Sequence, residues 1–150
     1  MNNVTIQLAS EDDLAEILPF VCAYHEFEEL NLTDIERERS VRTLLSDRLL
    51  GGIWLVHVDV EPVGYIALCF GYSIEFAGQD AFVDEFYIHP KFRDKGIGTK
   101  VLELIKEEAI KMNIRALHLE VARSNRKAQG LYSRAHFKAR EKYVIMSVNL

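Results

Sequence analysis

The stretch from residue 81 to residue 121 constrains the fold most, because its hydrophobic period changes twice. Residues 81–88 form an apolar run that stops at Pro90, which predicts a buried strand. Apolar residues then return at helical spacing over residues 96–112, and residues 115–121 again have the composition of a strand. This strand–helix–strand order is typical of a parallel crossover in an α/β fold.

The N-terminal part adds a strand and two helices. Residues 4–8 alternate between apolar and polar side chains, as a half-buried strand does. Ser10 with Asp13, and Thr33 with Glu36, match the capping-box pattern, in which two side chains three residues apart bond each other's backbone. Each pair therefore predicts the start of a helix.

The next segment predicts an antiparallel hairpin. We expect Gly51-Gly52 to end the second helix, because glycine is common where helices stop. Residues 53–58 and 63–70 are rich in β-forming side chains, and the short connection at residues 59–62 joins them. This part of the sheet should therefore be antiparallel.

The chain has the size and composition of one domain. It has 150 residues, of which 49% are hydrophobic, enough to bury one core. A short helix over residues 125–134 and a last strand over residues 143–148, which closes the sheet, complete the expected elements. We predict a single α/β domain over residues 1–150. It has a mixed central sheet with helices on both faces, built from an N-terminal strand, two helices, a hairpin and the strand–helix–strand unit.

Charge and cysteine content exclude several classes of partner and site. The 18 basic and 23 acidic residues leave a net charge of −5, which repels nucleic acid and mildly attracts cationic ligands. Cys22 and Cys69 lack the spacing of a disulfide framework or a metal site, and we expect no metal. No apolar run reaches the roughly 20 residues that cross a bilayer, and residues 1–5 lack the features of a signal peptide. We expect a cytoplasmic protein without a membrane or nucleic-acid partner.

A basic, glycine-containing turn lies between the predicted strand and helix. Arg93 and Lys95 supply positive charge, and Gly96 and Gly98 let the backbone approach a ligand closely. The first N–H groups of the helix point to the same place, where the helix dipole favours an anion. The turn is therefore a candidate pyrophosphate site, and a plain strand-to-helix turn is the structural alternative.

Two familiar phosphate-binding motifs do not fit this turn. The dinucleotide fingerprint requires a third glycine where Val101 stands, and the P-loop requires Gly-Lys-Ser/Thr where residues 98–100 are Gly-Thr-Lys. Glu120, about twenty residues beyond the turn, imitates the ribose-binding acid of a dinucleotide fold. Because the glycine pattern does not match, we do not favour a dinucleotide as the ligand.

The turn resembles that of the GNAT superfamily of acetyltransferases, which has the form Arg/Gln-x-x-Gly-x-Gly/Ala. Arg93, Gly96 and Gly98 match this pattern, and so do the preceding strand and Pro90. The resemblance covers roughly residues 81–150. The second region of the family follows in its usual order and spacing, and its matching residues here are Leu119, Glu120, Val121, Asn125, Ala128, Leu131, Tyr132 and Phe137.

The chain departs from the family pattern at two positions. Asp94 and His136 stand where the family usually has glycine. Asp94 places a carboxylate near the expected pyrophosphate, which weakens binding unless the side chain turns toward Lys95 or solvent. Neither change removes a group that the chemistry requires.

The resemblance implies acetyl-coenzyme A as co-substrate and a main-chain site for it. The strand around residues 86–88 would splay from its neighbour and offer N–H and C=O groups to the pantetheine arm, and one of its N–H groups would polarise the thioester carbonyl. The turn amides would hold the pyrophosphate, and Asn125 would contact the cofactor arm, although its residue type also favours a helix N-cap. The residues implied for the cofactor are Phe86, Tyr87, Ile88, Arg93, Asp94, Lys95, Gly96, Ile97, Gly98, Thr99 and Asn125.

Three residues are catalytic candidates for direct acetyl transfer to an amine. Asp84 and Glu85 lie in an otherwise apolar predicted strand and project to opposite faces, so at least one should face a wet cleft. Either fits a base that accepts the amine proton directly or through water. We favour Asp84, on the face of Phe86 and Ile88, and structural ion pairs are the alternative. The resemblance places Tyr132 beside the departing sulfur, where it stabilises the thiolate, and a core aromatic is the alternative.

The resemblance implies an enzyme that acetylates a primary amine. We expect a small polyamine-like or aminoglycoside-like acceptor, with residues 71–76 as candidates to line its pocket, and a protein N-terminus or lysine is the alternative. A non-catalytic acyl-CoA sensor module is the second hypothesis. Tyr132 and the strand carboxylates argue against it, because binding alone needs neither. Family analogy also suggests a homodimer built through the C-terminal strand.

Overall fold

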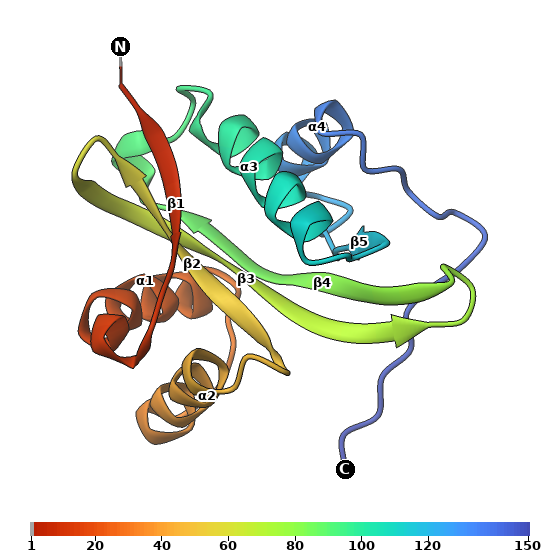
Figure 1. Cartoon of the computed structure of the whole chain (residues 1–150), viewed down its shortest axis with the longest axis horizontal. Helices are drawn as coiled ribbons and strands as arrows, with labels where there is room; N and C mark the ends of the chain where they lie inside the picture. Colours follow the sequence, from red (N-terminus) through yellow and green to blue (C-terminus); the bar gives the residue numbers. More distant parts are fainter. Residues whose placement is uncertain (1) are drawn as a thin grey trace. The chain divides into compact units, whose positions relative to one another are not determined.

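A computed structural model describes residues 2–150 of the protein (Figure 1). The chain divides into two compact units, the first up to Glu120 and the second from Val121 to Leu150. The first unit contains the whole sheet, and the second contains one helix. No helix within residues 2–150 has both the length and the apolar character needed to span a membrane.

The first unit is built on a mixed five-stranded sheet. Its strands, in spatial as in chain order, are β1 (Val4–Leu8), β2 (Gly51–Val58), β3 (Glu61–Ser73), β4 (Gly78–Ile88) and β5 (Ala116–His118). Strands β1 to β4 run antiparallel to their neighbours, whereas β5 pairs with β4 in parallel. The predicted mixed α/β sheet is confirmed, and so is the parallel crossover.

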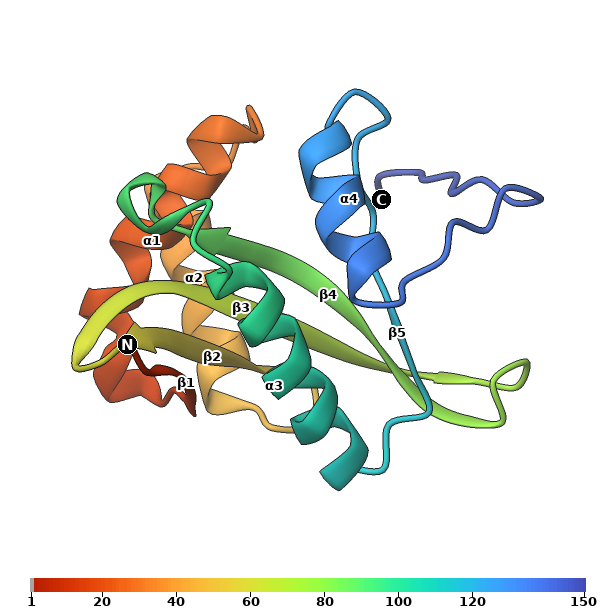
Figure 2. The ribbon, with the colours of Figure 1, turned by 90° about the horizontal axis from the view of Figure 1, so that it is seen from above.

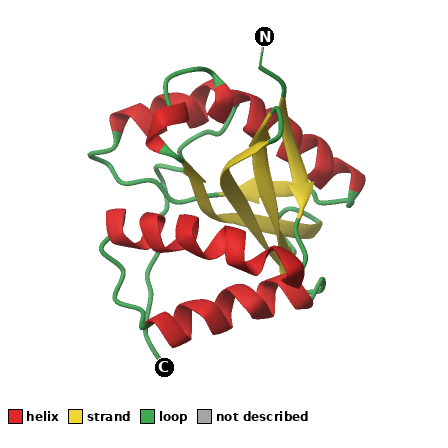
Figure 3. Ribbon diagram, turned by 90° about the vertical axis from the view of Figure 1, so that its left-hand side faces the viewer, coloured by secondary structure: helices red, strands yellow, loops and turns green. Residues whose placement is uncertain are grey.

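Helices of this unit cover both faces of the sheet. They are α1 (Leu14–Phe27), α2 (Asp34–Ser46) and α3 (Ile97–Lys111). Helices α1 and α2 pack on one face, and α3 lies on the other (Figures 2 and 3). The buried side chains of α1 and α2 form one core with Ile53, Leu55, Tyr65, Ala67 and Tyr87 of the sheet.

Both predicted capping boxes are present. The Asp13 carboxylate accepts the backbone N–H of Ser10 at 2.9 Å, and a short 3-10 turn leads from there into α1. The Glu36 carboxylate accepts the N–H of Thr33 at 2.8 Å, and the Thr33 hydroxyl accepts the N–H of Glu36 at 3.2 Å. The second box starts α2 at Asp34. Both helix starts predicted from the sequence are therefore confirmed.

The expected end of the second helix was wrong. Helix α2 ends at Ser46, and Gly51-Gly52 open β2 instead. At Gly51, φ is 152°, and a Cβ there would lie 1.9 Å from the carbonyl oxygen of Leu68 on the neighbouring strand. The glycine is needed because two strand backbones approach closely at this point, and not because a helix stops.

The extents of several strands also differ from the prediction. The turn between β2 and β3 is limited to residues 59–60, because β3 already begins at Glu61. Strand β5 covers only three residues of the expected 115–121. Residues 143–148 form no strand. The second unit, as described, holds no other strand beside them, and a β-strand needs a partner for its backbone N–H and C=O groups.

Candidate active site

One edge of β4 is only partly paired. On one side β4 pairs with β3 as far as Ile88, which lies opposite Gly64. On the other side the ladder with β5 covers only Asp80 to Phe82. From Val83 to Ile88 no strand within residues 2–150 pairs with this edge. Such an edge presents backbone N–H and C=O groups, which an extended ligand arm can bond in the manner of an added strand.

The open stretch of β4 leads through a turn into the N-terminus of α3. A 3-10 turn over Pro90–Phe92 follows the strand, and Gly96 occupies the N-cap of α3 with a φ of 79°. No side chain of the described residues bonds this cap. A Cβ added at Gly96 would meet nothing within 4 Å, so space is open there. An uncapped helix end with open space in front of it suits a pyrophosphate.

The two positions that depart from glycine both have a left-handed backbone. At Asp94, φ is 61°, and at His136 it is 72°. Glycine adopts this region without strain, and Asp and His are among the few other residue types enriched there. The usual glycine at each position therefore serves the backbone conformation. Asp94 keeps that conformation and adds a negative charge to the turn.

The two cationic side chains of the turn each make a cation–π contact with an aromatic ring. The Nε of Arg93 donates to the carbonyl of Ile88 at 2.7 Å, and its guanidinium lies 5.4 Å from the ring centre of Tyr87. The Nζ of Lys95 lies 5.7 Å from the ring centre of Phe92. Arg93 therefore braces the end of β4, a contact that the motif spacing did not indicate.

A β-bulge separates the two candidate carboxylates. The neighbouring residues Ala67 and Leu68 of β3 pair with Glu85 and Val83 of β4. Asp84 is therefore the extra residue of the bulge and has no partner in the ladder. The regular alternation of side chains along β4 is interrupted at this residue.

The bulge removes the basis for the expected placement of Asp84. Simple alternation put Asp84 on the face of Phe86 and Ile88, but alternation does not continue through a bulge. Asp84 is exposed, whereas the side chain of Glu85 is only 18% exposed. Burial and the charges of Asp84 and Glu85 raise the pKa of the Cys69 thiol to about 11. The charges of both carboxylates therefore act on the Cys69 thiol.

Glu85 is held at both carboxylate oxygens. The Nε2 of His25 lies 2.6 Å from Oε2, and the hydroxyl of Tyr65 donates to Oε1 at 2.9 Å. Burial raises the pKa of Glu85, the contacts of His25 and Tyr65 oppose the rise, and the charge of Asp84 adds to it. The net pKa is raised, which strengthens the carboxylate as a base. Tyr65 stays a phenol, because burial and then the charge of Glu85 raise its pKa.

Sequence reasoning missed His25 and Tyr65. No histidine was predicted from the sequence as a site residue, whereas His25 is 5% exposed and contacts Glu85. The available signal was its position on α1, where it continues the buried series of Ile17 and Val21 at steps of four residues. A polar residue in an apolar stripe needs a buried partner. Tyr65 gave no such signal, because a tyrosine in an apolar strand is an ordinary core residue.

In the second unit, helix α4 (Arg126–Arg134) carries Tyr132. The Oδ1 of Asn125 accepts the N–H of Ala128 at 3.1 Å. The capping role considered for Asn125 is therefore confirmed, and a cofactor contact would have to use the remaining atoms of its amide.

Helix α4 ends in a Schellman motif that includes the backbone of Tyr132. The N–H of His136 bonds the carbonyl of Ser133, and the N–H of Phe137 bonds the carbonyl of Tyr132. The rings of Tyr132 and Phe137 lie edge to face with centroids 5.9 Å apart. The tyrosine, the left-handed residue and the phenylalanine of the sequence pattern are thus parts of one helix-end structure.

The chain matches known proteins over most of its length. The model of a protein family described as the acetyltransferase (GNAT) family matches residues 15–137. An uncharacterised N-acetyltransferase of Archaeoglobus fulgidus is 30% identical over 85% of this chain and 88% of the relative. A thialysine N-epsilon-acetyltransferase of Bos taurus is 29% identical over 86% of this chain and 81% of the relative. The solved structure of an integron cassette protein from the mobile metagenome of Cole Harbour Salt Marsh has a TM-score of 0.83 at 29% identity, covering 95% of this chain and 89% of that chain.

Proposed function

The chain belongs to the GNAT family of acetyltransferases and is an N-acetyltransferase, and on this premise we propose that it acetylates a small cationic primary amine with Glu85 as the general base. The family takes its acetyl group from acetyl-CoA. The observation that carries the proposal is the Glu85 carboxylate, bonded by His25 and Tyr65 in the stretch of β4 whose outer edge is open. The candidate base therefore lies in the same stretch of strand as the open edge that suits an extended cofactor arm.

A base is needed because the acceptor must lose a proton before it attacks. With an amine pKa of about 10.4, only about one molecule in 2,500 is neutral at pH 7, a cost of about 4.6 kcal/mol. Glu85 takes that proton, and its raised pKa makes it a stronger base than an ordinary carboxylate. The neutral amine then attacks the acetyl carbon directly.

Charge supports a cationic acceptor. Asp84 is exposed at the bulge beside Glu85, so a carboxylate stands at the approach to the base. The net charge of −5 acts in the same direction at longer range. The bovine relative is named for acetylation of the N-epsilon amine of thialysine. A protein N-terminus or a lysine side chain is the alternative acceptor.

The proposed cofactor site uses the backbone of the first unit. The open edge at residues 86–88 holds the pantetheine arm, and the N–H groups at the start of α3 hold the pyrophosphate. The bound cofactor supplies a thioester, which is activated toward attack by an amine. Arg93 bonds the carbonyl of Ile88 at the end of β4, and so links the turn before α3 to the strand edge.

Replacing Asp94 with asparagine is expected to lower the KM for acetyl-CoA about two- to fivefold. Asparagine tolerates the left-handed φ of 61° as aspartate does, but it removes a negative charge from the turn that faces the pyrophosphate. The effect should shrink at high salt. A KM that stays unchanged at low salt would remove this turn from the pyrophosphate site.

Replacing Tyr132 with phenylalanine is expected to lower kcat by about tenfold or more while the Kd of acetyl-CoA stays within about twofold. We propose that its hydroxyl stabilises the departing thiolate by hydrogen bonding. Full proton transfer would be uphill by roughly 2 kcal/mol on unperturbed pKa values of about 10 and 8.5. The Schellman motif and the contact with Phe137 do not need the hydroxyl, so the fold should persist. Unchanged turnover would exclude Tyr132 from the mechanism.

The test of the proposed function is release of free thiol from acetyl-CoA against polyamines, aminoglycosides, basic amino acids and lysine-containing peptides. We expect turnover with a small cationic amine. Turnover with peptides alone would favour the protein acceptor. Tight acetyl-CoA binding without thiol release for any amine would contradict the proposal and favour the sensor module.

A further inference from the structure

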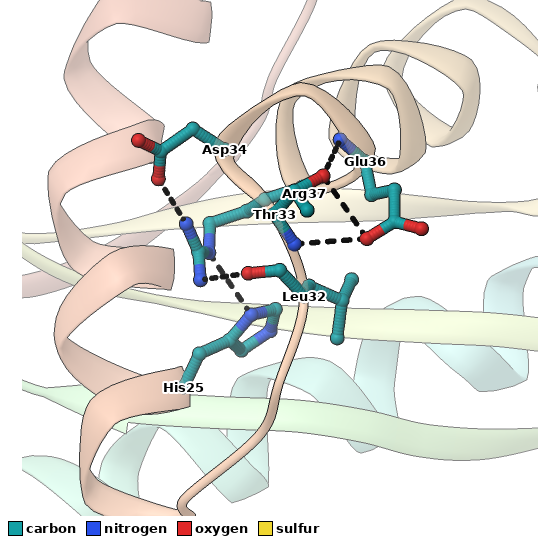
Figure 4. A network of polar contacts seen from close by, with 6 residues as sticks. All are labelled: His25, Leu32, Thr33, Asp34, Glu36 and Arg37. Atoms are coloured by element: carbon teal, nitrogen blue, oxygen red, sulfur yellow. Dashed lines mark hydrogen bonds and ion pairs between the residues drawn. The ribbon is translucent and has the colours of Figure 1, made fainter.

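His25 stands in a chain of polar contacts that runs from Glu85 to the start of α2. It lies in the last turn of α1 and is 5% exposed. Its Nε2 faces the Oε2 of Glu85 at 2.6 Å. Its Nδ1 accepts a hydrogen bond from the Nε of Arg37 at 3.2 Å, which Figure 4 shows. Both ring nitrogens are therefore engaged inside the protein.

Arg37 is itself fixed in place. Its Nη1 donates to Asp34 at 2.7 Å and its Nη2 donates to the carbonyl of Leu32 at 3.2 Å (Figure 4). The side chain of Arg37 is 11% exposed, although that of Asp34 is 98% exposed. The capping box of Thr33 starts α2 at Asp34 and thereby sets the position of Arg37 one turn later. Groups at the start of α2 therefore hold the guanidinium of Arg37 beside His25.

The guanidinium decides the tautomer of His25. Arginine has only hydrogen-bond donors and stays protonated, so the Nδ1 atom that it bonds must carry a lone pair. A neutral imidazole with a lone pair on Nδ1 carries its proton on Nε2, which then donates to Glu85. A second proton, on Nδ1, would point at a permanent cation whose nitrogen lies 3.2 Å away.

We propose that Arg37 is a positioning residue that holds His25 as the neutral Nε2–H tautomer, so that Glu85 receives a hydrogen bond from His25 but no full positive charge. This inference rests on the proposed role of Glu85 as the base. A histidinium beside Glu85 would stabilise the carboxylate and weaken it as a base. A neutral N–H donor orients the carboxylate of Glu85 without lowering its basicity as much. Because Arg37 blocks Nδ1, His25 does not relay the proton away from Glu85.

The other titratable groups around Glu85 do not take over this role. Tyr65 is neutral, because its pKa is raised by burial and by the charge of Glu85. Cys69, with a pKa of about 11, is also neutral at pH 7. Asp84 is a second negative charge, and it adds to the rise in the pKa of Glu85. The titratable groups facing Glu85 and its partners are Tyr24 and His25 of α1, Arg37 of α2, Tyr65 and Cys69 of β3, and Asp84 of β4.

Histidine-selective 15N NMR of the whole chain tests the tautomer directly. The His25 signals are those lost in the His25→Gln variant. We expect the neutral Nε2–H pattern throughout the range from about pH 6 to pH 8. An Nδ1–H tautomer or an imidazolium at pH 7 would overturn the proposal. The measurement needs no substrate and no variant of Arg37, so it holds even if Glu85 is not the base.

The variant Arg37→Met tests the consequence for catalysis. Without the guanidinium, Nδ1 accepts a proton as the pH falls, and the resulting histidinium weakens Glu85. We expect kcat/KM to fall about tenfold below wild type near pH 6 and to return to within about threefold near pH 9. The imidazolium pattern of His25 should appear over the same pH range. Arg37→Lys, which keeps a positive charge in this position, should restore most of the activity at pH 6.

Arg42→Met is the matched control. Arg42 lies on the same helix, its side chain is 51% exposed, and it pairs with Glu38 at 3.9 Å. We expect its pH profile to follow that of wild type. If Arg37→Met gave a profile parallel to that of Arg42→Met and unchanged His25 signals, Arg37 would not be a positioning residue. If Glu85→Gln kept full activity while the tautomer result held, the proposed base would fail and the assignment of His25 would stand.

Discussion

Replacing Glu85 with glutamine is expected to lower kcat for amine acetylation by about 10²- to 10³-fold while the KM for acetyl-CoA stays within about twofold. Glutamine has nearly the same shape, but it takes no proton from the amine. Because burial raises the pKa of Glu85, wild-type kcat/KM should fall as the pH drops through that raised pKa. This acid limb should disappear in Glu85→Gln. Thiol-release kinetics across pH measure both effects.

Asp84→Asn is the matched comparison for this experiment. Asp84 is the adjacent carboxylate, exposed in the bulge, and Asn again keeps the shape of the side chain. We expect Asp84→Asn to keep the acid limb and to raise chiefly the KM for the cationic acceptor. Loss of the acid limb in Asp84→Asn, with a normal profile in Glu85→Gln, would return the role of base to Asp84.

Replacing Gly64 with alanine is expected to lower the free energy of unfolding by about 3 kcal/mol or more. A Cβ at Gly64 would lie 2.0 Å from the carbonyl oxygen of Tyr87 and 3.0 Å from the Cα of Ile88. Both atoms belong to the backbone of β4, so the strands can admit the methyl group only by separating. The end of β4 would then shift, and turnover should fall with stability. Urea unfolding and steady-state kinetics on the same samples test this.

Gly71→Ala is the control on the same strand. A Cβ at Gly71 would lie 2.8 Å from the Oδ1 of Asp80, which is a side-chain atom and not backbone. The carboxylate can move by lengthening its 3.0 Å contact with the Nε2 of His118, without separating the strands. We expect a loss of less than about 1 kcal/mol. If Gly64→Ala and Gly71→Ala lowered the free energy of unfolding equally and only slightly, β3 and β4 would not approach each other closely beside Tyr87.

The sequence predicted correctly the features that depend on residues close together in the chain, and it missed those that depend on contacts between distant segments. The two capping boxes were predicted correctly, because each joins residues three positions apart. The bulge at Asp84 was not predicted, since an extra residue in one strand is recognised only against the register of its neighbour. For the same reason Gly51-Gly52 was misread as a helix end, because its close contact lies on another strand.

By itself the sequence determined the order of elements as far as α4, the helix starts and the turn that precedes α3. These features depend on periodicity, capping and glycine content, which act over a few residues. Only the tertiary structure decided which carboxylate is held as a candidate base. His25 lies 60 residues from Glu85 and 12 from Arg37 along the chain, and the three side chains come from a strand and two helices. Their contacts, and the burial that raises the pKa of Glu85, exist only once α1 and α2 pack on the sheet.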